Sequence, residues 1–299
     1  MSSHIDQEKI IENFDWSQLS LERLKLLQSK INKEINIKIH EKLTKGTANF
    51  SQDYEYQASF AYKVSLAKIF PHSMRGSLSK YDKCVFPISL GSKNFYTKRI
   101  EACIKWISDN FKNCLVLVGD SVHRLTIQVR EGIKEDEAWL KAIRIGEKFV
   151  NENYLLFQEY SEGCQFEFKM LSEIAKRSDF NIYYEELQGL YRKNESFQSM
   201  VNSFAQTYLN RVTQVEVEQV QELKQKHLAT TYLLEESALF TCLAKEGWLV
   251  FLYPGSINTF EEISEGLHPE VPLPLKQMIW VSLRLKRLNT KSGNENENK

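Results

Sequence analysis

The stretch Lys83-Cys-Val-Phe-Pro-Ile-Ser-Leu90 (KCVFPISL) is the first of two apolar runs that decide the fold. A short apolar run of this kind, ending in turn residues, predicts a buried strand. Residues 95–112 follow with apolar residues at helical spacing, and LVLVGD (115–120) is a second strand of the kind buried on both faces. Strand, helix, strand is the unit of a parallel sheet with a right-handed crossover, so the sequence predicts an α/β fold.

The pattern continues along the chain to residue 286. We predict helices at about 136–156, 180–211, 216–243 and 258–266, and strands at QFEFKM (165–170), WLVFLY (248–253) and QMIWVSLRL (277–285). One α/β domain is therefore expected over residues 82–286. The polar residues 287–299 are expected to be a disordered tail.

Residues 1–81 are predicted to be an N-terminal helical extension. Residues 19–45 carry apolar residues three or four apart, which predicts a helix with one buried stripe, and lysines occupy the rest of its surface. That lysine-rich surface is either a solvated face or a contact for a polyanion. Residues 46–81 have mixed periodicity and turn residues, which predicts an irregular or part-helical connection.

Composition limits the classes of function. Lysine plus arginine and aspartate plus glutamate number 39 each, so no global field attracts nucleic acid or membrane, and such a partner must meet a local patch. The five cysteines are scattered and form no C-x-x-C, which predicts neither disulfides nor a metal site. The N-terminus resembles no signal peptide and no apolar run is long enough to span a bilayer. We expect a soluble, cytoplasmic monomer.

Polar residues follow three of the predicted strands. Ligands of open parallel sheets bind beyond the carboxyl ends of the strands, so Ser89, Asp120 and Tyr253 can share one pocket. Ser89 also lies in a sequence close to the G-x-S-x-G turn of serine hydrolases, without its first glycine. A serine esterase would need a histidine beside it, and His123 or His268 could be recruited.

A second pair of polar residues is predicted on one helix. Tyr232 and Glu236 lie one turn apart on the same face, where a phenol and a carboxylate could bind a single ammonium. Half-exposed helix faces often carry such pairs without any function. Tyr253-Pro254 closes the following strand, and a proline there also serves as a strand terminator.

Together these residues resemble the tRNA-dependent cyclodipeptide synthases. The resemblance rests on Ile88-Ser-Leu-Gly91, on Phe95 before a helix that carries Trp106, on Tyr232-x-x-x-Glu236, and on Tyr253-Pro254, in this order from about residue 82 to 286. Two subgroups of the family differ at the position three after the serine and at the residue after the last tyrosine. Ser92 and Pro254 both match the subgroup that has a residue other than asparagine and then proline.

The resemblance implies a Rossmann-like parallel sheet with helices on both faces, similar to the catalytic domains of tyrosyl- and tryptophanyl-tRNA synthetases. It implies a transferase that makes a cyclic dipeptide from two aminoacyl-tRNAs through a covalent aminoacyl group on Ser89. Tyr232 and Glu236 would hold amino groups, and Tyr253 would relay protons. No cofactor is expected and no ATP, because the ester of an aminoacyl-tRNA already stores the activation.

The resemblance also implies binding residues. Gly91, Ser92 and Pro254 would lie at the substrate, and an apolar pocket for the first amino acid would be lined by Val85, Leu117, Leu239 and Phe251. A basic helix would face tRNA through Lys141, Arg144 and Lys148, although Glu137, Glu147 and Glu152 dilute its charge. A non-catalytic tRNA-binding protein with this fold, or less favourably a serine esterase, is the alternative.

Overall fold

The computed structural model describes residues 20, 23, 61–212 and 219–288. The chain divides into two compact units, residues 1–59 and 60–299, and everything below concerns the second. Apart from Ser20 and Arg23, the predicted helix over residues 19–45 lies outside the described residues, and so does the predicted tail from residue 289 onward.

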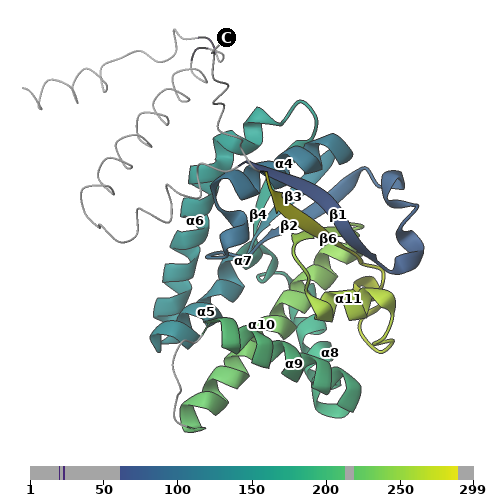
Figure 1. Ribbon diagram of the computed structural model, residues 1–299. Helices are drawn as coiled ribbons and strands as arrows, with labels where there is room; N and C mark the ends of the chain where they lie inside the picture. Colours follow the sequence, from purple (N-terminus) through teal and green to yellow (C-terminus); the bar gives the residue numbers. More distant parts are fainter. Residues whose placement is uncertain (1–19, 21–22, 24–60, 213–218, 289–299) are drawn as a thin grey trace, which may run out of the picture. The chain divides into compact units, whose positions relative to one another are not determined.

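Six strands form one sheet in the order β1-β6-β5-β2-β3-β4 (Figure 1). In chain order the strands are β1 (Tyr62–Phe70), β2 (Lys83–Ile88), β3 (Asn113–Val118), β4 (Gln165–Met170), β5 (Val250–Pro254) and β6 (Ile279–Arg287).

The helices of the described part follow the same chain order. They are η2 (His72–Met74), η3 (Leu78–Lys80), η4 (Lys93–Phe95), α4 (Thr97–Asn110), α5 (Asp120–Glu131), α6 (Glu135–Glu159), α7 (Leu171–Ile174), α8 (Ser178–Lys193), α9 (Glu195–Val212), α10 (Gln219–Lys245), α11 (Asn258–Glu265) and α12 (Leu273–Lys276).

Strand order reverses between β2 and β5. From β2 the chain moves outward through β3 to β4, and it then returns to β5 on the other side of β2 and continues to β6. All these neighbours are parallel, and only β1 runs antiparallel, on the outer edge of β6. Loops on either side of such a reversal diverge and leave a crevice at the carboxyl ends of the strands.

Helices cover both faces of the sheet, which confirms the predicted fold class. Alternate residues of β2 point to opposite faces: Val85 packs in a cluster with residues of α8, α9 and α10, whereas Cys84 and Phe86 pack with residues of α4 and α6. Both faces are apolar because both are buried, which is why the strands read as continuous apolar runs.

The structure corrects the sequence prediction at three places. Residues 62–70, expected in an irregular or part-helical connection, form edge strand β1, so the sheet begins well before residue 82. Residues 120–131, for which no helix was predicted, form α5. The single helix expected over residues 180–211 is two helices, with Asn194 between them.

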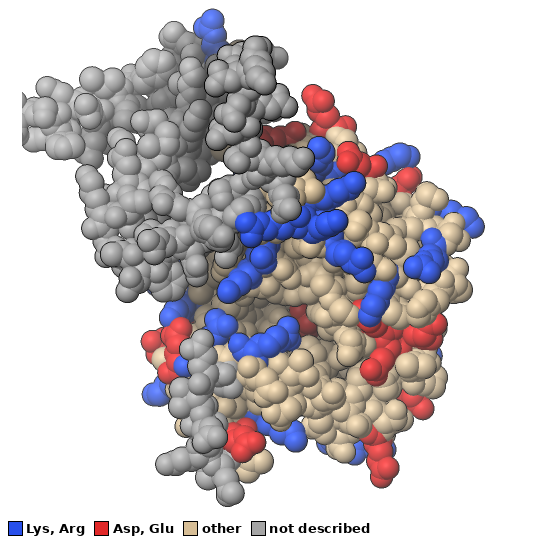
Figure 2. All heavy atoms as spheres, in the orientation of Figure 1, with Lys and Arg blue, Asp and Glu red and all other residues tan. Residues whose placement is uncertain are grey.

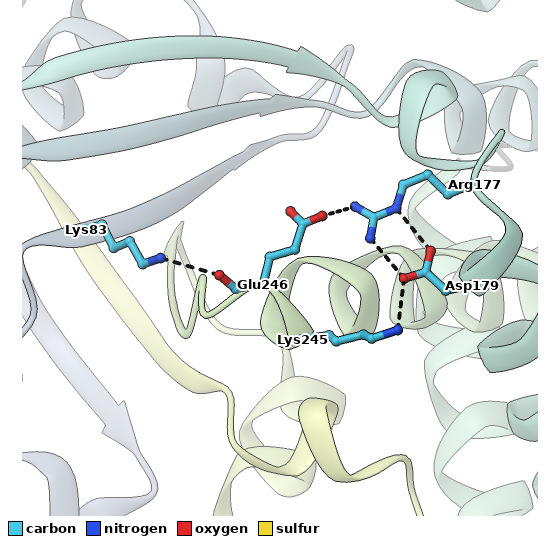
Figure 3. Close-up of polar contacts among 5 residues, drawn as sticks. All are labelled: Lys83, Arg177, Asp179, Lys245 and Glu246. Carbon is cyan, nitrogen blue, oxygen red and sulfur yellow. Dashed lines mark hydrogen bonds and ion pairs between the residues drawn. The ribbon is translucent and has the colours of Figure 1, made fainter.

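A charged cluster at the C-terminal end of α10 joins this helix to α8 and β2 (Figure 3). Arg177 donates to Asp179 and forms an ion pair with Glu246, while Lys245 pairs with Asp179 at 3.5 Å. Lys83, at the start of β2, donates to the carbonyl of Glu246. Asp179 lies in the first turn of α8 and Lys245 in the last turn of α10, where each charge also suits the helix dipole.

Edge strand β1 should be necessary for a stable sheet. A chain that begins at residue 82 loses the burial of Val64, Ile69 and Phe70, at roughly 1.5–3 kcal/mol each, and exposes the backbone edge of β6. Since whole domains are stable by only about 5–15 kcal/mol, we expect a much lower melting temperature and aggregation.

The control is a chain that begins at residue 60, which keeps β1. Calorimetry and size-exclusion chromatography of both truncated chains and of the full chain provide the measurement. Equal melting temperatures for the two truncated chains would contradict the assignment of β1 to the core.

Candidate active site

Ser89 opens a tight turn directly after β2. The N–H of Ser92 donates to the carbonyl of Ser89 at 3.1 Å, which closes a four-residue turn. Gly91, third in this turn, has φ +78°, a value that type II turns require there and that glycine adopts without strain. The glycine of the sequence pattern is therefore explained by the turn that positions Ser89.

The hydroxyls of Ser89 and Tyr253 share a hydrogen bond of 3.1 Å across the reversal of strand order. Tyr253 belongs to β5, and its ring lies between those of Phe95 and Trp280, with ring centroids 5.8 and 5.9 Å away. Burial raises the pKa of Tyr253. This phenol is therefore held in one place and stays protonated, able to pass a proton to or from Ser89.

Tyr232 and Glu236 face the same cavity from α10. The Tyr232 hydroxyl donates to Glu236 Oε1 at 3.4 Å, and Glu236 is only 8% exposed. Burial raises the pKa of Glu236 to about 8, although the bond from Tyr232 and the charge of Arg211 partly oppose this. The carboxyl is therefore largely protonated at neutral pH, and a bound cation would favour its ionised form.

The preceding residue, Glu235, has the opposite environment. Its two carboxylate oxygens accept bonds of 2.7 Å from the guanidinium of Arg124 on α5, and Arg124 also donates to the carbonyl of Ser121 at 2.8 Å. Glu235, which forms an ion pair, and Glu236, which forms none with the described residues, are therefore neighbours on α10. The pair fixes the rotation of α10 that turns Glu236 toward the cavity.

A cavity of about 600 Å³ joins these groups. It is lined by Ser89, Tyr232, Glu236 and Tyr253, the four residues predicted to be catalytic, and also by Gly91 and Ser92. Pro254 lies next to Tyr253 of the lining. The carbonyl of Pro254 accepts a hydrogen bond of 2.6 Å from the side-chain amide of Asn94, and the backbone N–H of Asn94 donates to Ser92 Oγ at 3.4 Å. Asn94 thus joins the loop after β2 to the end of β5.

Asp120 does not share this cavity, contrary to the expectation from the strand ends. It is fully buried and accepts the N–H of Ser172 at 2.9 Å. The serine esterase alternative also gains no support, because the hydrogen bond of the Ser89 hydroxyl is with Tyr253 rather than with a histidine.

The four apolar residues expected around the first amino acid do not line the cavity. They are exposed by at most 1% and belong to the core cluster against which Tyr232 and Tyr253 pack; they are Val85, Leu117, Leu239 and Phe251. In this structure that region is therefore packed core directly behind the two tyrosines.

The predicted tRNA-binding residues lie on α6, outside the cavity. Lys141 pairs with Glu131 at 2.6 Å and Lys148 with Glu152 at 3.6 Å, whereas no carboxylate of the described residues pairs with Arg144. All three side chains are exposed. Their role stays a prediction.

Sequence reasoning missed several cavity residues. Four basic side chains also line the cavity. They are Lys93 of η4, Arg99 of α4, Arg130 of α5 and Arg211 of α9. Phe204 and Tyr208 of α9 form an aromatic wall with Tyr232. The helical spacing of residues 204, 208 and 211 is the one signal that could have placed them on a common face.

His123 is the histidine of the cavity. Burial lowers its pKa to about 4, and the charge of Arg130 adds to the shift, so the imidazole is neutral. Among the described residues we find no cluster of metal-ligating side chains, and none of the described helices is both long and apolar enough to cross a bilayer.

Comparisons with known proteins bear on the family and the fold. A family model described as cyclodipeptide synthase matches residues 69–244, more than half of the chain. No curated protein matches the chain. Among solved structures, a cyclodipeptide synthase (CDPS) from Fluoribacter dumoffii is 23% identical, with 77% of this chain and 100% of that chain covered and a TM-score of 0.65.

Two further solved structures share the fold. The cyclodipeptide synthase from Candidatus Glomeribacter gigasporarum, solved bound to Phe-tRNAPhe, is 17% identical, covering 78% of this chain and 100% of that chain, with a TM-score of 0.56. The Mycobacterium tuberculosis protein Rv2275, whose structure demonstrates that cyclodipeptide synthetases are related to type I tRNA synthetases, is 14% identical, covering 76% and 93%, with a TM-score of 0.53.

The raised pKa of Glu236 predicts a pH-dependent stability. Between about pH 4.5 and about pH 8 the side chain is ionised in the unfolded chain but protonated in the folded one, so the wild type loses stability as pH rises through this window. Glu236→Gln removes this loss. We expect its melting temperature to rise relative to the wild type between about pH 5 and about pH 9.

Glu185→Gln, at an exposed position of α8, is the matched control. Its melting temperature should change between about pH 5 and about pH 9 as that of the wild type does. A difference between Glu236→Gln and the wild type that is the same at both pH values would mean that burial does not raise the pKa of Glu236.

Proposed function

The chain belongs to the cyclodipeptide synthase family, and we propose that it joins the aminoacyl groups of two aminoacyl-tRNAs into a cyclic dipeptide by a ping-pong reaction through Ser89. The observation that carries the proposal is the 3.1 Å bond between Ser89 and Tyr253 in a cavity that also holds Tyr232 and Glu236. A nucleophile, a proton relay and an acceptor for an amino group thus line one space.

In the first step Ser89 Oγ attacks the ester carbonyl of the first aminoacyl-tRNA. A bond forms between Oγ and the carbonyl carbon, the bond to the ribose oxygen breaks, and the tRNA leaves. The proton of Ser89 passes to Tyr253, which returns a proton to the ribose oxygen. The ester is already activated, so positioning of the reactants supplies much of the acceleration and no ATP is required.

The amino group of the bound residue is held by Tyr232 and Glu236. A carboxyl with a pKa of about 8 is matched to an α-amino group, whose usual pKa is about 7.7–8.0. Proton transfer between two groups of similar pKa is nearly balanced, so Glu236 can bind an ammonium and also take its proton.

In the second step the free amine of the second aminoacyl-tRNA attacks the aminoacyl ester on Ser89. The peptide bond forms and the bond to Oγ breaks. Glu236 takes the proton of the amine, Tyr253 gives its own proton to Oγ of Ser89, and the proton on Glu236 then restores Tyr253, so that one proton passes in total from the amine to Ser89. The amine of the resulting dipeptidyl-tRNA then attacks the remaining ester, which closes the ring and releases the second tRNA.

Substrate contacts complete the proposal. We also propose that the chain is of the subgroup with proline after the last tyrosine, as Ser92 and Pro254 suggest. The contact of both residues with Asn94 supports a shared role in holding the Ser89 turn against Tyr253. Lys141, Arg144 and Lys148 are proposed to contact tRNA at a distance from the cavity.

Expression of the chain in a bacterium should release a new diketopiperazine into the medium, detected by mass spectrometry. Ser89→Ala should abolish the product, because it removes the hydroxyl proposed as the nucleophile. The fold should be kept, because the change removes only this one group from a turn. After incubation with radiolabelled aminoacyl-tRNA and acid precipitation, label should remain on the wild type and be absent from the variant.

Equal labelling of the two proteins would exclude Ser89 as the site of the covalent step. Soluble wild-type protein that forms no product and takes no label with any aminoacyl-tRNA would instead favour a non-catalytic tRNA-binding protein.

Glu236→Gln should stop the reaction after the first transfer. The amide keeps the shape of the side chain but cannot accept the proton of the incoming amine, so labelled aminoacyl-enzyme should accumulate while product formation falls by roughly 100-fold or more, the usual contribution of general acid–base catalysis. Glu262→Gln, on α11 and outside the cavity lining, is the control. Product at the wild-type rate would place Glu236 outside the mechanism.

A further inference from the structure

The cavity has an excess of positive charge that the chain as a whole lacks. The whole sequence is neutral, with 39 basic and 39 acidic residues. The cavity lining includes four basic residues, Lys93, Arg99, Arg130 and Arg211, and a single acidic one, Glu236. We call these four residues the basic rim. Figure 2 shows lysine and arginine side chains gathered around a hollow on one face of the molecule.

Within the described part of the chain, no carboxylate neutralises the basic rim. Lys93 and Arg130 have no polar partner among the described side chains, and Arg211 donates only to a carbonyl of its own helix, that of Thr207 at 3.4 Å. Arg99 donates to Asn94, lies over the ring of Tyr62, and keeps its buried Nε without a partner. Burial of an unpartnered guanidinium nitrogen is costly unless a ligand completes its bonds.

Three other cations of α5 and α6 have carboxylate partners. Arg124 is held by Glu235, and on α6 Lys141 and Lys148 are held by Glu131 and Glu152. Arg144, also on α6, has no carboxylate partner among the described residues, as is true of the basic rim.

The charges of the basic rim act on the interior of the cavity. After burial itself, the charge of Arg130 is the largest influence that lowers the pKa of His123. Arg211 opposes the rise that burial causes in the pKa of Glu236 and of Tyr253. Arg211 therefore acts on two of the proposed catalytic groups and Arg130 on a neighbouring residue of the same cavity lining.

We propose that the basic rim binds the phosphodiesters of the 3′-terminal nucleotides of tRNA and so holds the ester at Ser89. This inference rests on the proposed function, and it assigns the nucleic acid a subsite within the cavity in addition to α6. An aminoacyl-tRNA end carries an ammonium a few bonds from a run of phosphates. The cavity has the complementary polarity, with Glu236 for the ammonium and the basic rim for the phosphates.

Binding of deacylated tRNA tests this subsite separately from catalysis. We would measure the affinity of full-length tRNA, and of the same tRNA lacking its last three nucleotides, for the wild type and for the double variant Arg130→Ala with Arg211→Ala. The wild type should prefer the intact tRNA, whereas the variant should bind both alike. Its slope of log affinity against log salt for intact tRNA should fall by about 1.4, or about 0.7 for each single-stranded phosphate that the variant no longer neutralises.

Two controls make the result specific. Lys105→Ala with Lys193→Ala removes the same charge from exposed positions on α4 and α8 that do not line the cavity, and should keep the preference for intact tRNA. Arg130→Lys with Arg211→Lys keeps the charge and should restore most of the slope. Circular dichroism establishes that each variant is folded.

The inference is overturned if the alanine variant keeps the wild-type preference and slope, or if the wild type binds intact and shortened tRNA alike. Neither outcome depends on product formation, so an enzyme that makes its cyclic dipeptide with an uninvolved basic rim would be recognised as such. A protein that makes no product but binds through the basic rim would be recognised equally well.

Discussion

The buried ion pair between Arg124 and Glu235 is the interaction on which the site depends. Successive residues of a helix point about 100° apart, so Glu235 and Glu236 face different surroundings. The carboxylate of Glu235 accepts two hydrogen bonds from a guanidinium on α5, whereas Glu236 faces the cavity with only the hydroxyl of Tyr232 as its hydrogen-bond partner among the described residues. A turn of α10 about its axis would break the first contact and remove the second group from the cavity. The charged cluster around Arg177 and Asp179 holds the far end of the same helix. The ion pair therefore helps to set the orientation of α10.

The charge of the cavity lining differs from that of the whole chain. The neutral chain provides no long-range field. At the reversal of strand order, the four cations of the basic rim line one cavity together with a largely protonated carboxyl, phenols and a hydroxyl. A low-dielectric interior strengthens each of these interactions. Under the proposed function, this local charge would contribute to recognition where the chain as a whole has none to offer.

Sequence predicted the central strands because β2, β3 and β5 are buried on both faces and need apolar residues at nearly every position. It failed for β1, whose exposed side carries Lys63 and Lys68 and whose buried residues are few. It failed for α5 because that helix buries polar residues, His123, Arg124 and Thr126, where an apolar stripe would be expected. The four residues proposed to be catalytic were recognisable as a family pattern, and the structure places them around one cavity. The basic rim was not, because its members come from separate elements and only the folded sheet brings them together.

The polarity of the cavity also bears on how the enzyme would finish its cycle. Each substrate would be held at two charged ends, an ammonium near Glu236 and phosphates at the basic rim. A diketopiperazine has neither, since both amines have become amides and both nucleic acids have left. Its formation would return Glu236 to the protonated state that its burial favours. Release of product would then need no opening of a lid, and product inhibition should be weak whichever two amino acids are joined.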